Sequence, residues 1–560
     1  MSSTSARPAL SRAGSDRKEK ISALGVALVL IFVCQAAALC WFNFTQLENH
    51  VGYDSSWAYL RSVLMWQEKA LTFPNWHEST SLQIDTHMIL VSLLYGLTGN
   101  IWLASGIGNT LMVALLLLFM WKILARLKVK FTARMAAMNL VICPYLTNGF
   151  EVFNDLGYFS CLLSGAAQYC LRALLPMMIA YEFLKIVQDR KMGILPWIIC
   201  PLCALCGSSS GVYLVIIILA PYLAYEVEMA AIRNDWKQLT RKESLFAYLC
   251  CAFVLAGKVL SVLLLDYEAS DGSSTWTALT HLGVNFSAVL RGFPKLLQVL
   301  PLTNRGYYPI LSVTGLLRVF TLAIFAMILV SIAFTLRRTV RNVNEGDGMY
   351  LFLLNIVAVN FLVLGLHNAS YGTIIFEERY LIVTFLAAVL MTGLLLDSLE
   401  DGRVLSVLLS LGLAVSVLAV DVHSDYNYLR ATNDDWPMEE IQALAEDQEA
   451  GIVYVWGDDV TVIGRSLRVL DLNRVYKMIP DGGGYYRHHF GDYYTYDTNE
   501  EYTGPTLLVC PAGQHLVPES VLAEYSLLAE GLPYTVLDNA GHLLTGVLEV
   551  YVSDHNPHLW

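Results

Sequence analysis

Charge is scarce in this sequence of 560 residues: Asp, Glu, Lys and Arg make up 15% of it, and 56% is hydrophobic. Soluble domains carry about 25% charged residues, so this composition excludes a mainly water-soluble protein. A transmembrane helix needs roughly 20 mostly apolar residues. The sequence therefore predicts a mainly α, polytopic helical membrane bundle with about eleven spans, near residues 21–42, 101–124, 134–150, 158–187, 194–208, 211–230, 245–265, 308–336, 349–366, 380–397 and 404–421.

Cysteine is nearly absent from the last quarter of the chain, where only Cys510 follows residue 421. This excludes a disulfide framework for that part. The run CPLCALC at 200–206 has metal-like spacing, but it lies in an apolar span without His or acidic partners, where Cys packs as a small hydrophobe. The sequence also lacks an internal repeat of roughly 20 to 50 residues. Its two halves show no convincing similarity, which argues against a transporter built from repeated halves.

Basic residues are rare on one side of the predicted membrane. The N-terminal tail and every second later boundary together hold 21 Lys and Arg, whereas the opposite loops before residue 421 hold six. Basic loops resist translocation, so we expect residues 1–20 to form a cytoplasmic basic tail. The first apolar run lacks a small-residue cleavage site and is interpreted as a retained span. An odd number of spans then puts everything after residue 421 outside the cytoplasm.

Residues 422–560 differ in composition from the spans. From residue 421 onward the chain has 23 Asp and Glu against 6 Lys and Arg, and such a surface attracts neither nucleic acid nor anionic lipid. GIVYVWG, PTLLVC and GVLEVYV are typical of strands, and PMEEIQALAEDQ and PESVLAEYSLLAE of helices. The sequence predicts a small extracytoplasmic α/β domain here, after a transmembrane domain at 21–421. The stretch PDGGGYYRHHFGDYYTYD is either a sugar-stacking loop or plain packing.

The predicted outer loop at 43–100 is too long for a simple connector. It contains NHVGYDSSWAYLRSVLMWQE, in which Trp57, Leu60 and Leu64 recur at helical spacing, and the short apolar segment THMILVSLLYGLTGN. Both suit helices that lie on the outer bilayer surface, with aromatic residues at headgroup depth. They would form a roof over the bundle and hold Asp54 against the membrane boundary, where a carboxylate is a candidate general base.

Other ionisable residues are predicted near the same side of the membrane. Placing a charged side chain there costs free energy unless it is paired or serves a function. The short loop NGFEVFNDLGYFS brings Glu151 and Asp155 there, four residues apart. Lys258, Arg291 and Arg379 follow in or beside later spans, and a cation at that depth can neutralise a lipid phosphate. The alternative for Lys258 is snorkelling to the surface, and for Arg291 it is the solvated edge of an amphipathic helix.

These features resemble the GT-C superfamily of membrane glycosyltransferases, which includes protein O-mannosyltransferases and the bacterial lipid A aminoarabinose transferase. The resemblance consists of a first span, a long outer loop with an early Asp54, the run GNIWLASGIGNTLMVALLLLFMWKIL, a basic turn, a second acid in FNDLG and the segment EERYLI before a late span. It covers residues 21 to about 421. At the level of single residues it depends on Asp54, Asp155 and Arg379.

The resemblance implies a sugar donor carried on polyprenyl phosphate and its transfer, on the extracytoplasmic face, to a glycan, lipid or protein acceptor. It implies Asp54 as the general base, Asp155 and Glu151 as further acids, and the three cations named above at the donor phosphate. Many members carry an acidic pair in the first loop, which would hold a divalent metal ion. Here Asp54 is followed by Ser55 and Ser56, so a metal ion and a metal-free site both stay open.

Two other classes of function stay open at this point. A lipid-linked sugar flippase or transporter would show charged residues deep in several spans, of which Arg172 is one case. A non-catalytic envelope-assembly protein would bind partners through the outer domain. The predicted location is the plasma membrane of a bacterium, judged only from the general character of the sequence. The ER membrane is the alternative, because the sequons at Asn43, Asn285 and Asn368 would lie outside the cytoplasm.

Overall fold

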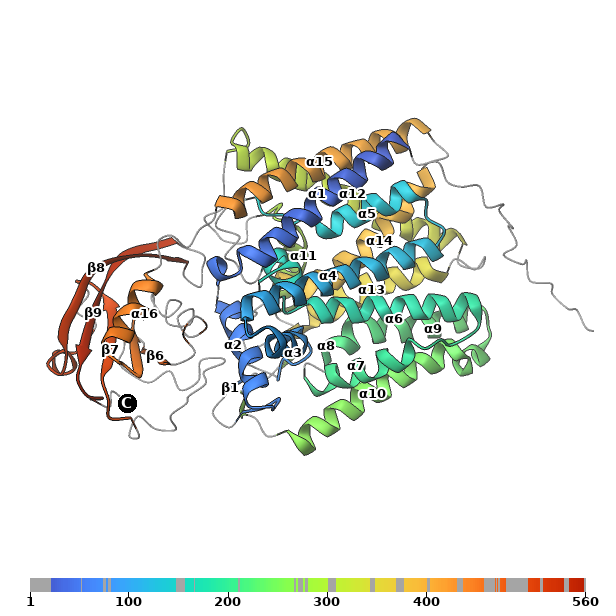
Figure 1. Cartoon of the computed structure of the whole chain (residues 1–560). Helices are drawn as coiled ribbons and strands as arrows, with labels where there is room; N and C mark the ends of the chain where they lie inside the picture. Colours follow the sequence, from blue (N-terminus) through green and yellow to red (C-terminus); the bar gives the residue numbers. More distant parts are fainter. Residues whose placement is uncertain are drawn as a thin grey trace, which may run out of the picture.

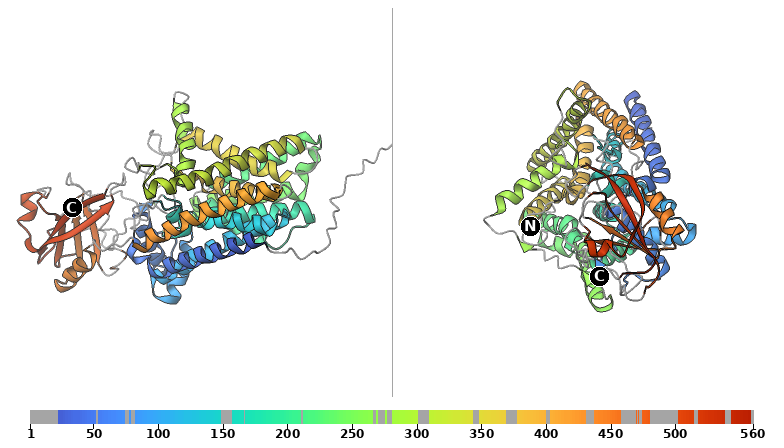
Figure 2. Two further views of the ribbon diagram at one scale, coloured as in Figure 1. Left: turned by 90° about the horizontal axis from the view of Figure 1, so that it is seen from above. Right: turned by 90° about the vertical axis from the view of Figure 1, so that its left-hand side faces the viewer.

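Long helices form a bundle, and a five-stranded sheet lies beyond one end of it (Figures 1 and 2). We call this the sheet end, and the opposite end, where α1 begins, the far end. The computed structural model describes residues 22–51, 53–73, 77–78, 82–147, 157–165, 167–209, 212–265, 268–269, 275–276, 281–300, 309–342, 348–368, 377–399, 403–430, 437–457, 469, 471, 474–479, 502–513, 517–537 and 543–557.

The helices of the bundle follow the predicted apolar runs in order along the chain. Within the described residues, eight helical stretches are long and apolar enough to cross a membrane, so the chain is a multi-pass membrane protein. The bundle contains α1 (Ala23–Thr45), α4 (Ile101–Arg126), α5 (Phe131–Ile142), α6 (Cys170–Asp189), α7 (Pro196–Ser208), α8 (Val212–Leu214), a π-helical turn (Val215–Leu219), α9 (Ala220–Ile232), α10 (Lys242–Leu264), α11 (Leu282–Leu296), α12 (Val313–Asn342), α13 (Gly348–Leu366), η8 (Glu378–Leu381), α14 (Ile382–Leu399) and α15 (Arg403–Arg430).

Three of the predicted spans form helices that are shorter or more charged than the other eight. α5 has 12 residues and α7 has 13, while α6 has 20 and includes four charged residues. The expectation of a span over 134–150 was too long. α5 stops at Ile142 because Pro144 disfavours helical backbone in the residue before it, and Cys143 is accordingly extended, with φ −60° and ψ 124°.

α14 lies at the centre of the bundle, and its residues from 382 to 396 are all buried. A helix that is apolar on every side can face lipid or lie among other helices, and the burial of α14 shows that it lies among other helices. α1 and α15 pack near the edge, where Leu30 and Val33 of α1 and Val415 and Leu418 of α15 are exposed. α15 continues past residue 421, where its apolar run ends. Asp421 is buried there and accepts a hydrogen bond from Gln35 of α1, which satisfies one oxygen of a costly buried carboxyl group.

Two helices of the first loop, α2 (Tyr53–Gln67) and α3 (Met88–Thr98), lie at the sheet end, and Figure 1 shows α2 running across the end of the bundle. α3 ends at Gly99, whose φ of 66° suits a residue without a side chain. Asn100 then caps α4 by accepting a hydrogen bond from the Leu103 N–H at 2.9 Å. One apolar cluster contains Val63 of α2 and Val91 of α3. The structure thus contains the two helices predicted for the roof.

The C-terminal sheet has the order β6-β5-β7-β9-β8, with parallel pairing among the first three strands and antiparallel pairing in the rest. Its central strands β5 and β7 are buried along their whole lengths, as expected for strands covered on both faces. α16 (Met438–Asp447) packs on one face through Ile441 and Ala445. The strand bounds are β5 (Ile452–Trp456), β6 (Val475–Ile479), β7 (Thr506–Pro511), β8 (Ser526–Leu537) and β9 (Leu543–Ser553).

The helix expected over PESVLAEYSLLAE was mostly wrong. Only Glu519–Leu522 forms a helix, α18, and the chain from Ser526 onward is strand β8. β8 pairs with β9 from Ser526 to Leu537, so long-range strand pairing outweighs the local helical preference of Leu, Ala and Glu. The Gly- and Tyr-rich stretch at 480–497 lies outside the described residues.

Two short strand pairs join loops at the bundle. β1 (His77–Glu78) of the first loop pairs in parallel with β2 (Glu268–Ala269), which follows α10. β3 (Thr275–Trp276) pairs antiparallel with β4 (His367–Asn368) at the end of α13. Segments far apart in the sequence therefore meet there.

Candidate active site

α2 places Asp54 in its first turn. The structure describes the backbone of Asp54 but not its side chain, and Glu151 and Asp155 lie outside the described residues. The neighbouring Ser55 and Ser56 are buried. The roles of the three acids therefore remain predictions, and the described site consists of Asp85, Arg172, Arg379 and the side chains that contact them.

A buried ion pair joins the first loop to α6. The Asp85 carboxylate accepts hydrogen bonds from Arg172, from Nε at 3.0 Å and from Nη2 at 2.7 Å. It accepts another from the Ser209 hydroxyl at 2.6 Å. The Asp85 side chain has no exposed surface, and that of Arg172 is 10% exposed. The planar guanidinium suits this two-point contact, which fixes the segment before α3 to α6 and to the end of α7.

Two tyrosine rings flank the Arg172 guanidinium. Its Cζ lies 5.3 Å from the ring centroid of Tyr169 and 5.9 Å from that of Tyr213, and the two rings meet edge to face. The Tyr213 hydroxyl is buried and has no hydrogen-bond partner within the described residues. A buried hydroxyl without a partner is costly. It therefore offers a donor to a ligand that reaches Arg172.

Arg379, in η8, lies against the same Tyr169 ring, with its Cζ 6.0 Å from the ring centroid. Its Nε donates to Glu377 at 2.6 Å and its Nη1 donates to the side-chain oxygen of Gln168 at 3.1 Å. The Arg379 side chain is 16% exposed. Its guanidinium is therefore held in place by a carboxylate, an amide and a ring, and two arginines from separate elements meet at one tyrosine.

The other predicted phosphate ligands lie elsewhere. Lys258 is exposed on α10, beside the exposed Val259, which agrees with snorkelling. Arg291 is exposed on α11. On the same helix, Lys295 Nζ lies 3.2 Å from Glu378 Oε1, so α11 contacts η8 next to Arg379.

Two buried histidines belong to the sheet end. Burial lowers the pKa of His50 and of His87 to about 4, so both imidazoles are neutral at pH 7. His50 stacks on Phe42 at 4.9 Å between ring centroids, and His87 directly precedes α3. Both histidines therefore add no positive charge to the site at neutral pH.

The described residues do not form a metal site. Within this part of the chain, no group of three or more His, Cys, Asp or Glu side chains could hold a metal ion. Both Asp85 oxygens accept hydrogen bonds from Arg172 or Ser209, which occupy positions that a hard cation would need. The three cysteines of the CPLCALC run are free and buried, as the packing interpretation predicts.

Sequence reasoning missed the pairing of Asp85 with Arg172, although each residue carried a signal. An arginine in an apolar run needs a partner, because an uncompensated buried charge is strongly destabilising. The two residues are 87 positions apart, so only the fold shows which acid meets it. Gln168 and Ser209 carry no signal in the sequence.

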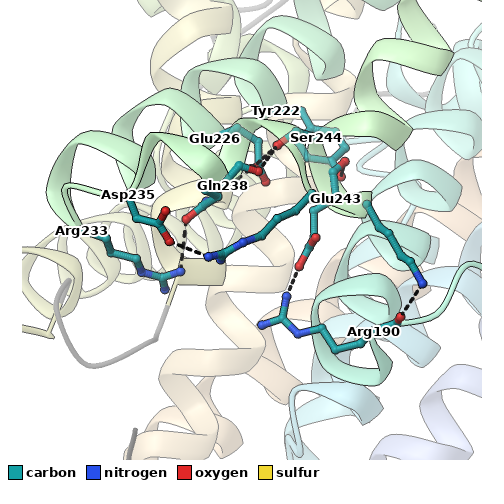
Figure 3. Close-up of polar contacts among 10 residues, drawn as sticks. Arg190, Tyr222, Glu226, Arg233, Asp235, Gln238, Glu243 and Ser244 are labelled. Atoms are coloured by element: carbon teal, nitrogen blue, oxygen red, sulfur yellow. Dashed lines mark hydrogen bonds and ion pairs between the residues drawn. The ribbon is translucent and has the colours of Figure 1, made fainter. Parts of the chain in front are cut away.

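A second polar cluster joins α9, η5 (Trp236–Thr240) and α10 at the far end (Figure 3). The Glu226 carboxylate accepts hydrogen bonds from the Ser244 hydroxyl at 2.6 Å and from Gln238 at 3.3 Å. Arg190, at the end of α6, pairs with Glu243 of α10. These contacts connect helix ends that adjoin along the chain or in the bundle, so we assign them to packing.

No protein-family model matches the sequence, and no curated protein matches it. Among solved structures, the fold is similar to that of ArnT from Cupriavidus metallidurans in the apo state, with 13% identity and a TM-score of 0.50, over 94% of this chain and 98% of that one. The same ArnT bound to undecaprenyl phosphate has 11% identity and a TM-score of 0.48 over 95% and 98% of the two chains. An Archaeoglobus fulgidus oligosaccharyltransferase complex with Zn and sulfate has 12% identity and a TM-score of 0.46 over 93% and 73%. The chain thus has an ArnT-like fold, a helical membrane bundle followed by a small sheet, which is the fold class that its sequence predicts.

Proposed function

We propose that the chain is an integral-membrane glycosyltransferase, which moves a sugar from a polyprenyl-phosphate-linked donor to an envelope acceptor on the extracytoplasmic face. One observation carries the proposal: in a chain with an ArnT-like fold, Arg172 and Arg379 lie against one tyrosine ring at the sheet end. Arginines with little exposed surface are costly near a membrane unless they are paired or serve a function. They fit a site that must receive a lipid-linked anion.

The phosphate of the donor would lie near Arg379. Sugar transfer breaks the bond between the anomeric carbon and a phosphate oxygen, so negative charge grows on the departing phosphate. A fixed guanidinium stabilises this charge more in the transition state than in the ground state. Arg379 is only partly exposed and already oriented by Glu377 and Gln168, so little reorganisation is needed. The exposed positions of Lys258 and Arg291 favour contacts with lipid headgroups instead.

Asp54 would act as the general base. Its carboxylate takes the proton of the acceptor hydroxyl or amine while the acceptor oxygen or nitrogen forms a bond to the anomeric carbon. The lipid phosphate leaves with the electron pair of the broken bond. The position of Asp54 in the first turn of α2 supports this role, because α2 lies at the same end of the bundle as Arg379. Asp155 and Glu151 are the next candidates for the base.

Purified protein tests the reaction with synthetic polyprenyl-phosphate donors that carry different sugars. We expect Asp54→Asn to lower transfer by roughly 10²–10⁴-fold, the usual contribution of a positioned base, with unchanged melting. Asp189→Asn, an exposed residue at the far end, is the matched control and should transfer normally. Near-normal turnover by Asp54→Asn would remove Asp54 from the mechanism. Failure of the wild type with every polyprenyl-phosphate donor would contradict the function itself.

The proposal also requires the sheet end to face outward, in the plasma membrane. The ER alternative depended partly on sequons, but Asn43 and Asn285 are buried and their amides donate hydrogen bonds to backbone carbonyls, so neither suits a glycan. Ser520 and Thr240 are exposed in the sheet region and at the far end, respectively. In intact cells or spheroplasts, an impermeant thiol reagent should label Ser520→Cys and spare Thr240→Cys. The reverse pattern would show that the orientation is wrong.

A further inference from the structure

Tyr213 differs from three other tyrosines of the bundle in what its hydroxyl contacts. The hydroxyls of Tyr145, Tyr158 and Tyr222 donate to backbone carbonyls at 2.8, 2.6 and 2.8 Å. The Tyr213 hydroxyl is buried too, but it has no hydrogen-bond partner within the described residues. Because an unpaired buried hydroxyl costs free energy and is rare in native proteins, it indicates a partner from outside the chain, either water or a ligand.

An irregular stretch of backbone places Tyr213 at the site. α7 is followed by Ser209, whose hydroxyl donates to Asp85 and whose backbone is not helical, with φ −105° and ψ −103°. Tyr213 lies in the short α8, and a π-helical turn follows directly. π-helical turns are uncommon overall and recur at functional sites. One short stretch of chain therefore brings Ser209 to the Asp85 carboxylate and the Tyr213 ring to Arg172.

Tyr169 connects Tyr213 with the proposed phosphate ligand. The rings of Tyr169 and Tyr213 meet edge to face, with 5.7 Å between their centroids, and the Arg379 guanidinium lies against Tyr169. Tyr213 is thus separated from Arg379 by one aromatic ring. In a sugar donor of the proposed kind, the sugar is bonded directly to the phosphate. A sugar whose phosphate lies at Arg379 must therefore lie within the same short range.

The groups beside the Tyr213 hydroxyl suit an uncharged sugar. Arg172 bonds the fully buried Asp85 carboxylate through Nε and Nη2, so its charge is compensated by direct contact and Nη1 is left as a further donor. A guanidinium N–H and a phenol hydroxyl can each bond a sugar hydroxyl. The rings of Tyr169 and Tyr213 add apolar surface for the C–H groups of a sugar. Sites for small molecules typically combine such aromatic surface with a few fixed polar groups.

We infer that Tyr213 is a specificity-determining residue for the donor, whose hydroxyl bonds a hydroxyl group of the sugar while Arg379 holds the phosphate. The inference rests on the proposed function. A site that bonds a substrate hydroxyl discriminates against an analogue without it, because a buried polar group is then left unpaired. The alternative is an ordered water at the Tyr213 hydroxyl, which would fill the same place whatever sugar is bound.

Two tyrosine variants and two kinds of probe separate these alternatives. Tyr213→Phe removes only the hydroxyl. Tyr222→Phe is the matched control, because it removes a buried hydroxyl that is bonded within the chain, to the Glu243 carbonyl at the far end. Binding by the full-length proteins in detergent is measured with synthetic polyprenyl phosphate alone and with polyprenyl phosphates that carry a hexose or a pentose. The sugar-carrying probe that the wild type binds best is then made again without each ring hydroxyl in turn.

We expect Tyr213→Phe to melt at or above the wild-type temperature, because it removes an unpaired buried group. It should bind polyprenyl phosphate alone normally and the sugar-carrying probe about 3- to 10-fold more weakly, the usual effect of one hydrogen bond. For the wild type, removal of one sugar hydroxyl should weaken binding by a similar factor, and the same removal should have no further effect on Tyr213→Phe. Tyr222→Phe should melt lower and bind every probe normally.

Equal binding of the sugar-carrying probes by the wild type and Tyr213→Phe would indicate water at this position and overturn the inference, while the proposed function would stand. Equal weakening with polyprenyl phosphate alone would place the hydroxyl at the phosphate and also overturn it. If Tyr213→Phe does not fold, the probes that lack one hydroxyl decide with the wild type, and the inference is wrong when none of them binds more weakly. A wild type that binds neither kind of probe would contradict the proposed function and the inference together.

Discussion

The two ends of the bundle contain similar kinds of side chains in different arrangements. At the sheet end, Asp85 and Arg172 are 87 positions apart, and Arg379 contacts Gln168 across 211 positions. At the far end, Arg241 and Asp235 are six positions apart, and their side chains are 31% and 33% exposed. Exposed pairs contribute little to stability, whereas a buried pair is costly to break. Of these pairs, the one that is costlier to break thus joins segments distant in sequence, as is common in a binding or catalytic site.

The largest difference between the ends should appear in stability. Arg172→Ala leaves the Asp85 carboxylate buried without its cation, which typically costs about 3–5 kcal/mol. Arg241→Ala breaks a pair with Asp235 in which both side chains are about a third exposed, and it should change stability by about 1 kcal/mol or less. Thermal unfolding of both variants in the same detergent measures the contrast. Equal losses would show that the two ends do not differ in the way proposed here.

A smaller effect, confined to activity, is expected at Arg379. Arg379→Ala should weaken use of the polyprenyl-phosphate donor by about 10- to 100-fold. This corresponds to roughly 1.4 to 2.7 kcal/mol, the usual contribution of a charged contact. The melting temperature should fall little. Arg241→Ala, whose cation pairs with Asp235 at the far end, should leave donor use unchanged. If Arg379→Ala loses stability and activity in equal measure, Arg379 belongs to a structural ion pair with Glu377.

The smallest effect concerns pH. Burial lowers the pKa of His87 to about 4 from its ordinary 6.5, so protonation favours the unfolded chain. The stability that neutral His87 contributes is present above pH 6.5 and is lost as the pH falls toward 4. His87→Leu should therefore show a shallower fall of melting temperature between pH 6.5 and 4, and the exposed His281→Leu should follow the wild type. Parallel curves for all three proteins would contradict the assignment.

The sequence predicts the fold better than it predicts the site. The length of the apolar runs indicates the helices of the bundle, because a helix that crosses the membrane must be apolar over about 30 Å. Aromatic spacing indicates α2. By contrast, β8 was predicted as helix, because its pairing with β9 depends on a partner that local propensity does not include.

Site residues were predictable only where chemistry singles them out. Arg379 stands out as a cation at the start of a span, and the structure places it against Tyr169. Asp85 looks like an ordinary loop residue, since its partner Arg172 lies 87 positions away. Pairing at such separations is set by helix packing, which the sequence of one chain does not show.

If the sheet end transfers a sugar to the cell envelope, mass spectrometry of envelope glycans will detect the product. Glycans are compared from cells that lack the protein and from the same cells supplied with wild type, Asp54→Asn or Asp189→Asn at equal membrane levels. We expect a glycan mass increment of one sugar that requires the protein, persists with Asp189→Asn and is lost with Asp54→Asn. Identical glycans in all four samples would contradict it.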